Sequence, residues 1–146
     1  MEINLCQLGP LSCFGCCGHS YKNIEKIKQD IRFNTLEFEE IKDLEKFRDR
    51  ASKYNLRGSG VCRNVIEKNG TIFCPLHPSL NNGNDLRDGH CDINHLCEAF
   101  KQFMKWDKEK QNKFVDFIIK LNLDNYQYSI FMDSGELLRR FITFWV

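Results

Sequence analysis

The sequence lacks a long hydrophobic run. No apolar stretch approaches the roughly 20 residues that a membrane-spanning helix needs, so we expect a soluble chain without a membrane partner. Residues Met1 to Gln7 contain no basic segment, and Pro10 interrupts the apolar stretch that follows, so no secretory signal peptide is predicted. We therefore expect a cytoplasmic protein, and in a reducing compartment clustered cysteines more often bind metal or do redox chemistry than form disulfides.

The sequence also lacks a surplus of charge of one sign. Its 21 Lys and Arg residues are balanced by 20 Asp and Glu residues, which leaves a formal charge of +1. Proteins that bind nucleic acid usually present a basic surface, so no nucleic-acid partner is expected. A metalloprotease or hydrolase is not predicted either, because the chain has no His-Glu-x-x-His motif and no Ser or Cys nucleophile beside a recognisable base.

Eight cysteines are the most unusual feature of the composition, and three of them stand together. Cys13, Cys16 and Cys17 lie within five residues, and Gly15 and Gly18 can supply the positive φ values that a turn around a metal requires. Thiolates are strong metal ligands, so this segment predicts a metal site. The other candidate ligands are Cys6, Cys62, Cys74, Cys91 and Cys97.

The number of metals is open at this level. A tetrahedral Zn²⁺ site takes four Cys or His ligands and a [4Fe-4S] cluster takes four thiolates, so the cysteines suffice for two sites, or for one site with spare thiols. Adjacent side chains such as Cys16 and Cys17 rarely point at one atom, which favours different irons of a cluster, or two separate metals, over a single zinc. For His77, His90 and His95 a hydrogen-bonding role is favoured over ligation.

Cysteines and aromatic residues occupy different parts of the chain. Every cysteine lies between Cys6 and Cys97, whereas eleven of the eighteen aromatic residues lie from Phe100 onward. No linker separates the two parts, so we expect one domain over 1–146, with a metal-binding part at 6–97 and a helical, aromatic-rich core part at 98–146. A chain of this length can bury a core without disulfide staples.

Residue patterns predict an α+β fold that is mostly helical, with one β-hairpin and a cysteine-rich metal site. Asn69-Gly70 indicates a type I′ turn in which Lys68 faces Thr71, and it places Cys74 opposite Val65. One helix is predicted after Ser20 and a second where Asn34 and Glu37 form a capping box. Further elements are predicted as helices from residue 94, after Asp107 and after Asp133, with an extended piece at 126–132.

The cysteine spacing resembles that of the YkgJ-like family, a zinc- or iron-chelating domain with eight cysteines. The first motif of that family is Cys-x2-Cys-x2-Cys-Cys, and Cys13, Cys16 and Cys17 match its last three positions. Cys6 substitutes for the first position, which falls on Pro10 here. The resemblance covers residues 6–97 and implies metal binding through the cysteines. Members with a similar cluster include a flagellin lysine methylase that depends on an iron-sulfur cluster.

The sequence therefore predicts a small cytoplasmic protein that chelates zinc or an iron-sulfur cluster through its cysteines. The alternative is an iron-sulfur-dependent enzyme or redox carrier, and a secreted, disulfide-stapled protein is a third possibility. The metal or cluster is the only partner that the sequence indicates.

Overall fold

The computed structural model describes residues 3–50, 56–87, 91 and 95–145. The chain forms two compact units. The helical unit comprises Met1–Cys16 and Leu96–Val146, and the hairpin unit comprises Cys17–His95. The chain therefore passes from one unit to the other between the adjacent residues Cys16 and Cys17, and returns before Leu96.

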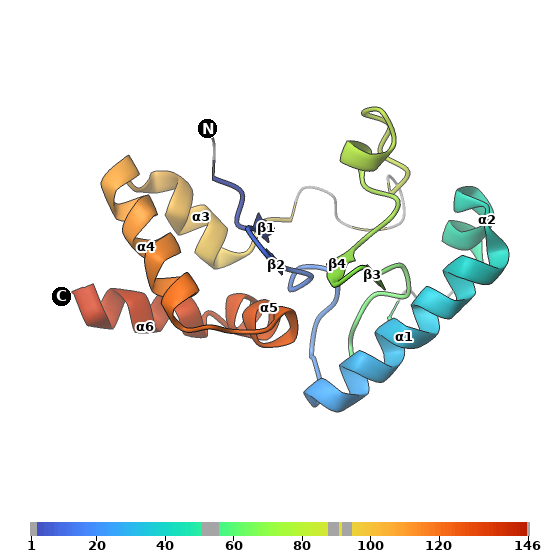
Figure 1. Cartoon of the computed structure of the whole chain (residues 1–146), viewed down its shortest axis with the longest axis horizontal. Coiled ribbons are helices and arrows are strands. Elements are labelled where there is room, and N and C mark those ends of the chain that lie inside the picture. The colour runs from blue at the N-terminus through green and yellow to red at the C-terminus, as the bar shows by residue number, and fades with distance from the viewer. Residues whose placement is uncertain (1–2, 51–55, 88–90, 92–94, 146) are drawn as a thin grey trace. The chain divides into compact units, whose positions relative to one another are not determined.

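The helical unit consists of one small hairpin and a group of helices (Figure 1). Asp107 caps the helix that follows it, as predicted, by accepting a hydrogen bond from the Lys110 N–H. In chain order the elements are β1 (Gln7–Leu8), β2 (Leu11–Ser12), α3 (Glu98–Lys105), α4 (Lys108–Lys120), α5 (Asn125–Ser134) and α6 (Glu136–Trp145).

The prediction of an extended piece at 126–132 was wrong, because these residues belong to α5. Asp124 and Gln127 form a reciprocal capping box that starts this helix. Gly135, with φ of 79°, ends it, and α6 begins at the next residue rather than after a cap at Asp133. Two short helices joined by a left-handed glycine thus replace the predicted strand and single helix.

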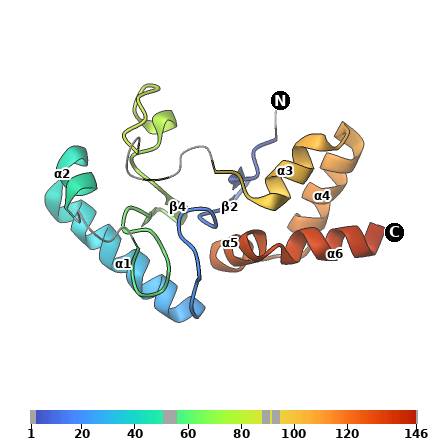
Figure 2. The ribbon, with the colours of Figure 1, turned by 180° about the vertical axis from the view of Figure 1, so that it is seen from behind.

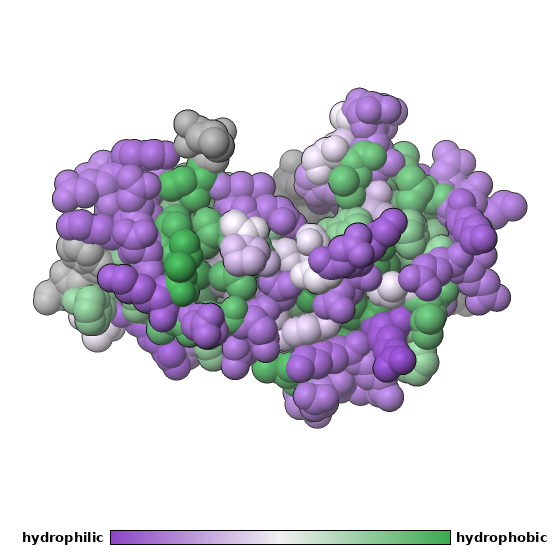
Figure 3. Space-filling model, in the orientation of Figure 1, coloured by the Kyte–Doolittle hydropathy of each residue, from purple (hydrophilic) through white to green (hydrophobic). Residues whose placement is uncertain are grey.

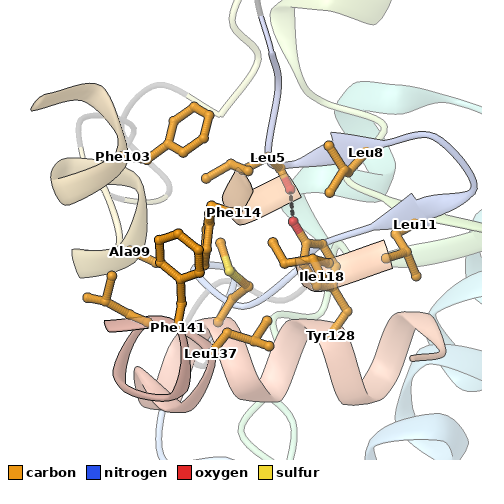
Figure 4. Packing of buried hydrophobic residues seen from close by; sticks show 12 residues of the cluster. Leu5, Leu8, Leu11, Ala99, Phe103, Phe114, Ile118, Tyr128, Leu137 and Phe141 are labelled. Carbon is orange, nitrogen blue, oxygen red and sulfur yellow. Dashed lines mark hydrogen bonds between the residues drawn. The ribbon is translucent and has the colours of Figure 1, made fainter. Parts of the chain in front are cut away.

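Aromatic residues form the centre of the helical unit's core. The Phe114 ring lies 5.0 Å from that of Phe141 and 6.1 Å from that of Phe103, between centroids. The N-terminal segment contributes Leu5, Leu8 and Leu11 to the same cluster (Figure 4). The core of the aromatic-rich part therefore includes residues far away in sequence, which the composition alone did not indicate.

The hairpin unit contains the predicted β-hairpin. Strand β3 pairs with β4 so that Lys68 lies opposite Thr71, which confirms the predicted register. Asn69 and Gly70 both have positive φ, 54° and 80°, as a type I′ turn requires. The elements of this unit are α1 (Ile24–Ile41), α2 (Leu44–Asp49), β3 (Ile66–Lys68), β4 (Thr71–Phe73) and the 3₁₀ helix η1 (Pro78–Leu80).

Helix α1 packs against β3 and is longer than predicted (Figure 2). Asn23 caps it, whereas the expected cap, Ser20, has a left-handed backbone with φ of 53°. The helix continues through Asn34, so the predicted second start at this residue was wrong. Asn34 does not cap a helix because its amide is engaged by groups outside α1, as described below.

The described residues confirm a mostly helical α+β fold, with a second hairpin, β1–β2, that was not predicted. The single domain with parts at 6–97 and 98–146 stays a prediction, and the compact units divide the chain at other positions. Within the described part of the chain, no helix combines the length and hydropathy that crossing a bilayer requires. Hydrophilic residues cover most of the face seen in Figure 3, with hydrophobic areas between them.

Candidate metal centres

The β1–β2 hairpin brings two cysteines of the helical unit together. Gln7 pairs with Ser12, and one position further out the Cys13 N–H donates to the Cys6 carbonyl at 3.0 Å. Gly9, with φ of 60°, lies in the turn. Cys6 and Cys13 therefore face each other across the open end of the hairpin, although six residues separate them in sequence.

Four cysteines of the helical unit lie close enough to affect one another electrostatically. The Cys13 thiol interacts with those of Cys6, Cys16 and Cys97, and Cys97 in turn interacts with Cys16. Cys97 occupies the N-cap position of α3, although its side chain forms no capping hydrogen bond. The nearby N–H groups of Phe100 and Ala99 favour its thiolate. We call Cys6, Cys13, Cys16 and Cys97 the helical-unit set.

The surroundings of Cys6 and Cys13 favour their protonated thiols. Burial is the main cause that raises the pKa of Cys6 to about 11 and the pKa of Cys13 well above its ordinary range, and neighbouring thiols raise both further. The Gly15 N–H, which donates to Cys13 Sγ at 3.3 Å, opposes this shift. Four thiolates can share this space only if a cation offsets their mutual repulsion.

Helix α5 holds the backbone of this set. The Tyr128 hydroxyl donates to the Leu5 carbonyl at 2.5 Å, next to Cys6 (Figure 4). The Ser129 hydroxyl accepts from the Phe14 N–H at 3.0 Å, next to Cys13. At Gly15 a Cβ atom would lie 2.7 Å from the Ser129 carbonyl, so only glycine allows this close approach.

A second pair of cysteines faces each other in the hairpin unit. The Cys62 N–H donates to the Cys17 carbonyl at 2.9 Å, beside an antiparallel bridge between Gly18 and Val61. Cys74 directly follows β4, and its thiol interacts electrostatically with those of Cys62 and Cys91. We call Cys17, Cys62, Cys74 and Cys91 the hairpin-unit set. Cys17 joins it through its backbone pairing with Cys62.

Cys62 and Cys74 begin turns of the same kind. The Cys62 carbonyl accepts from the N–H three residues on, at Val65, and the Cys74 carbonyl does the same from His77, both at 3.2 Å. In each turn the backbone N–H two residues after the cysteine favours the thiolate. The Asn64 N–H lies 3.5 Å from Cys62 Sγ, and the Leu76 N–H acts on Cys74. The Gly15 N–H donates to Cys13 Sγ in the same way in the helical unit. A thiolate that accepts a backbone N–H is stabilised for metal binding.

Two arginines place positive charge near the hairpin-unit set. Arg50 favours the Cys62 thiolate, and Arg87 favours that of Cys74. Burial nevertheless dominates, so it raises the pKa of Cys62 and raises that of Cys74 to about 12. For Cys6 and Cys13 the neighbouring charged groups are other thiols, which raise the pKa. The two sets therefore differ in electrostatic surroundings.

The described histidine rings either form hydrogen bonds or lie exposed. His77 caps η1, because its Nδ1 accepts from the Ser79 N–H at 3.1 Å, and burial together with Arg87 lowers its pKa. This matches the hydrogen-bonding role that the sequence favoured. His95 is exposed, and His90 lies outside the described residues.

The cysteines of the two sets do not already form a ligand shell. Among the residues that the structure describes, no three His, Cys, Asp or Glu side chains are arranged to hold a metal ion, and none of the eight cysteines forms a disulfide. Binding an ion would therefore require cysteine side chains to rearrange. The donors fit soft, thiophilic metals, since each set supplies four thiols, of which Cys13 in one set and Cys62 in the other accept a backbone N–H.

Sequence reasoning found all eight cysteines but assigned none of them to a particular set. It also missed Tyr128, Ser129 and Asn34, which hold the backbone beside the cysteines. No local pattern could have found them, because each acts on a segment at least 28 residues away. The chain matches no protein-family model, no curated protein and no solved structure. The resemblance to the YkgJ-like family thus rests on cysteine spacing alone.

Proposed function

We propose that the protein binds two metal ions, one in each unit, and that each ion is held by four thiolates and stabilises the fold. The observation that carries this proposal is the division of the cysteines. Eight cysteines separate into two groups of four, and the border between the units falls between the adjacent residues Cys16 and Cys17. Cys16 and Cys17 then bind different ions, so two adjacent side chains need not coordinate the same metal.

Each set joins distant parts of its own unit. The helical unit is made of two separate stretches of chain, and Cys97 from the second stretch meets three cysteines from the first. In the hairpin unit, Cys17 is the first residue and Cys91 lies near the end. Each unit has about half of the chain, and below roughly 80 residues a single core rarely supplies more than about 3–5 kcal/mol. A bound metal would add its binding free energy to folding.

Zinc is the metal that we propose. Four protein ligands with no position for substrate are typical of structural Zn²⁺ sites. The adjacency of Cys16 and Cys17 no longer favours a polynuclear cluster, because the two residues belong to different sets. In this proposal the protein works in a reducing compartment such as the cytoplasm, where the thiols stay available to the metal.

The [4Fe-4S] alternative has the same ligand number, and the experiment must separate the two. Protein purified anaerobically is analysed for zinc, iron and acid-labile sulfide, and its visible absorption is recorded. We expect about two zinc ions per chain and a colourless sample, because each site takes four thiolates. A brown sample with iron and sulfide would overturn the choice of zinc. Metal-free protein with disulfides would overturn metal binding itself.

Single substitutions at the border test the division into two sets. Cys16→Ser and Cys17→Ser should each retain about one zinc, and the double variant should retain none, because each cysteine completes a different four-ligand site. His19→Ala is the matched control, since His19 is an exposed neighbour outside both sets, and it should retain both ions. Loss of both ions from either single cysteine variant would indicate one shared centre.

A further inference from the structure

The turn that carries Cys62 is held from outside by side chains of α1. Asn34 lies in the middle of this helix and is fully buried, with 0% of its surface exposed. Its Nδ2 donates to the Cys62 carbonyl at 2.9 Å and to the Val65 carbonyl at 2.9 Å. These carbonyls belong to the first and last residues of the turn, so one amide group holds both of its ends.

The orientation of the Asn34 amide is also fixed. Its Oδ1 accepts from Arg57 Nε at 2.9 Å, while both hydrogens of its Nδ2 are used by the turn. Arg57 forms an ion pair with Glu37, one turn further along α1. An asparagine flipped by 180° would direct its donors at a guanidinium and its acceptor at a carbonyl. The network therefore accepts only one arrangement of this side chain.

Arg50, which follows α2, holds the middle of the same turn. Its guanidinium donates to the Arg63 carbonyl and, at 3.0 Å, to Asn64 Oδ1, and it pairs with Glu37 at 2.9 Å. Three carbonyls of the turn, at positions 62, 63 and 65, thus accept hydrogen bonds from side chains of α1 or from Arg50. With the carbonyls held on that side, the Asn64 N–H is directed at Cys62 Sγ.

We infer that Asn34 is a positioning residue for the hairpin-unit metal site, an inference that rests on the proposed function. It contacts no sulfur, and it acts by fixing the turn in the conformation that directs a backbone N–H at the Cys62 thiolate. Groups that orient a metal ligand in this indirect way typically contribute about 10–100-fold to metal affinity. The effect should be confined to one of the two sites, because the hydrogen-bond partners of Asn34 belong to the hairpin unit.

Two variants of Asn34 test this in the full-length, metal-loaded chain. Asn34→Asp keeps the shape and the acceptor for Arg57 but removes both donors, and Asn34→Leu removes all three hydrogen bonds. Thr35→Val is the control, because Thr35 also bonds α1 to the hairpin, through the Glu67 N–H, without touching the Cys62 turn. Circular dichroism checks that each variant is folded.

The readouts are chelator competition, the spectrum of the Co²⁺-substituted protein, and alkylation of the cysteines followed by mass spectrometry. For both Asn34 variants we expect one of two dissociation constants to rise about 10–100-fold. The Co²⁺ bands of one site should change, and alkylation should increase at Cys17, Cys62, Cys74 and Cys91 only. Thr35→Val should leave metal affinity and spectrum unchanged.

Two results would overturn the inference. One is an unchanged pair of dissociation constants and an unchanged Co²⁺ spectrum in both Asn34 variants. The other is an equal loss at both sites, matched by Thr35→Val, which would reduce Asn34 to a general contribution to stability. Either result leaves the proposed function intact, provided that the wild type binds two ions. If the wild type binds none or only one, the proposed function itself fails.

Discussion

The substitution Tyr128→Phe isolates one buried hydrogen bond beside the helical-unit set. The Tyr128 side chain is 0% exposed, and its hydroxyl donates to the carbonyl of Leu5, which is 1% exposed (Figure 4). The change removes a single oxygen atom and keeps the aromatic ring, so the packing of the core is preserved. What remains is a buried carbonyl without its donor, in a segment that leads directly to Cys6.

The expected cost follows from that lost donor. A buried polar group left without a partner costs about 1–3 kcal/mol, and a chain of about 150 residues loses roughly 2–4 °C of melting temperature per kcal/mol. We therefore expect Tyr128→Phe to lower the free energy of unfolding by about 1–3 kcal/mol, with the zinc stoichiometry unchanged.

Alkaline pH gives this prediction a second signature. Burial, and then the thiols of Cys13, Cys6 and Cys97, raise the pKa of the Tyr128 phenol. Above roughly pH 10 the unfolded chain ionises this phenol while the folded chain keeps it protonated, so wild-type stability falls there. The phenylalanine variant has no such group. The difference in stability between the two proteins should therefore shrink as the pH rises above about 10.

Urea denaturation at a fixed free zinc concentration measures both effects, because bound metal otherwise shifts the midpoint. Ser134→Ala is the control: its hydroxyl donates to a backbone carbonyl, that of Phe131, and accepts from the Glu136 N–H, both on the exposed surface. This control should change stability by less than about 0.5 kcal/mol. If Tyr128→Phe matches the control, the hydrogen bond to Leu5 does not hold the N-terminal segment and the reasoning is refuted.

Three further predictions address the core, the close approach at α5 and the protons of the sites. Phe114→Ala should cost about 3–5 kcal/mol in a denaturation experiment and leave two zinc ions per chain, because Phe114 is fully buried in the core and is not itself a metal ligand. Gly15→Ala should release only the helical-unit zinc, measured by elemental analysis, because its Cβ would meet the Ser129 carbonyl at 2.7 Å. Each zinc ion bound near pH 7 should release about four protons, because thiols must lose their protons to bind metal and burial raises the pKa of a ligand such as Cys74 to about 12. Zinc affinity should therefore fall as the pH falls, and pH-stat titration counts the protons released.

Sequence reasoning succeeded where the decisive interactions are local. The type I′ turn needs positive φ at two successive residues, and Asn69-Gly70 meets that need by itself, so the register of β3 and β4 followed correctly. Asp107 likewise caps its own helix through a bond to a residue three positions on. The eight cysteines could be named as candidate ligands from their residue type alone, and their binding of metal stays a prediction.

Sequence reasoning failed where a residue's partner is remote. Asn34 has the residue type of a helix cap, but its amide bonds to Cys62 and Val65, some thirty positions away, and so it stays inside α1. Tyr128 lies in a run rich in aromatic residues that suits a strand equally well, and only the capping box at Asp124 and its packing in the core decide for a helix. The assignment of cysteines to two sets also depends on pairings that no spacing rule contains.

The expectation that a chain of 146 residues needs no staple depends on its forming one continuous core. The chain forms two compact units, and the helical unit is assembled from two stretches separated by the whole hairpin unit. Closing so long an intervening loop is entropically costly, and a cross-link that joins the two stretches offsets part of that cost. Cys97 meets Cys6, Cys13 and Cys16 at that junction. A metal bound by these four thiols, as we propose, would supply that cross-link and needs no catalytic role to explain it.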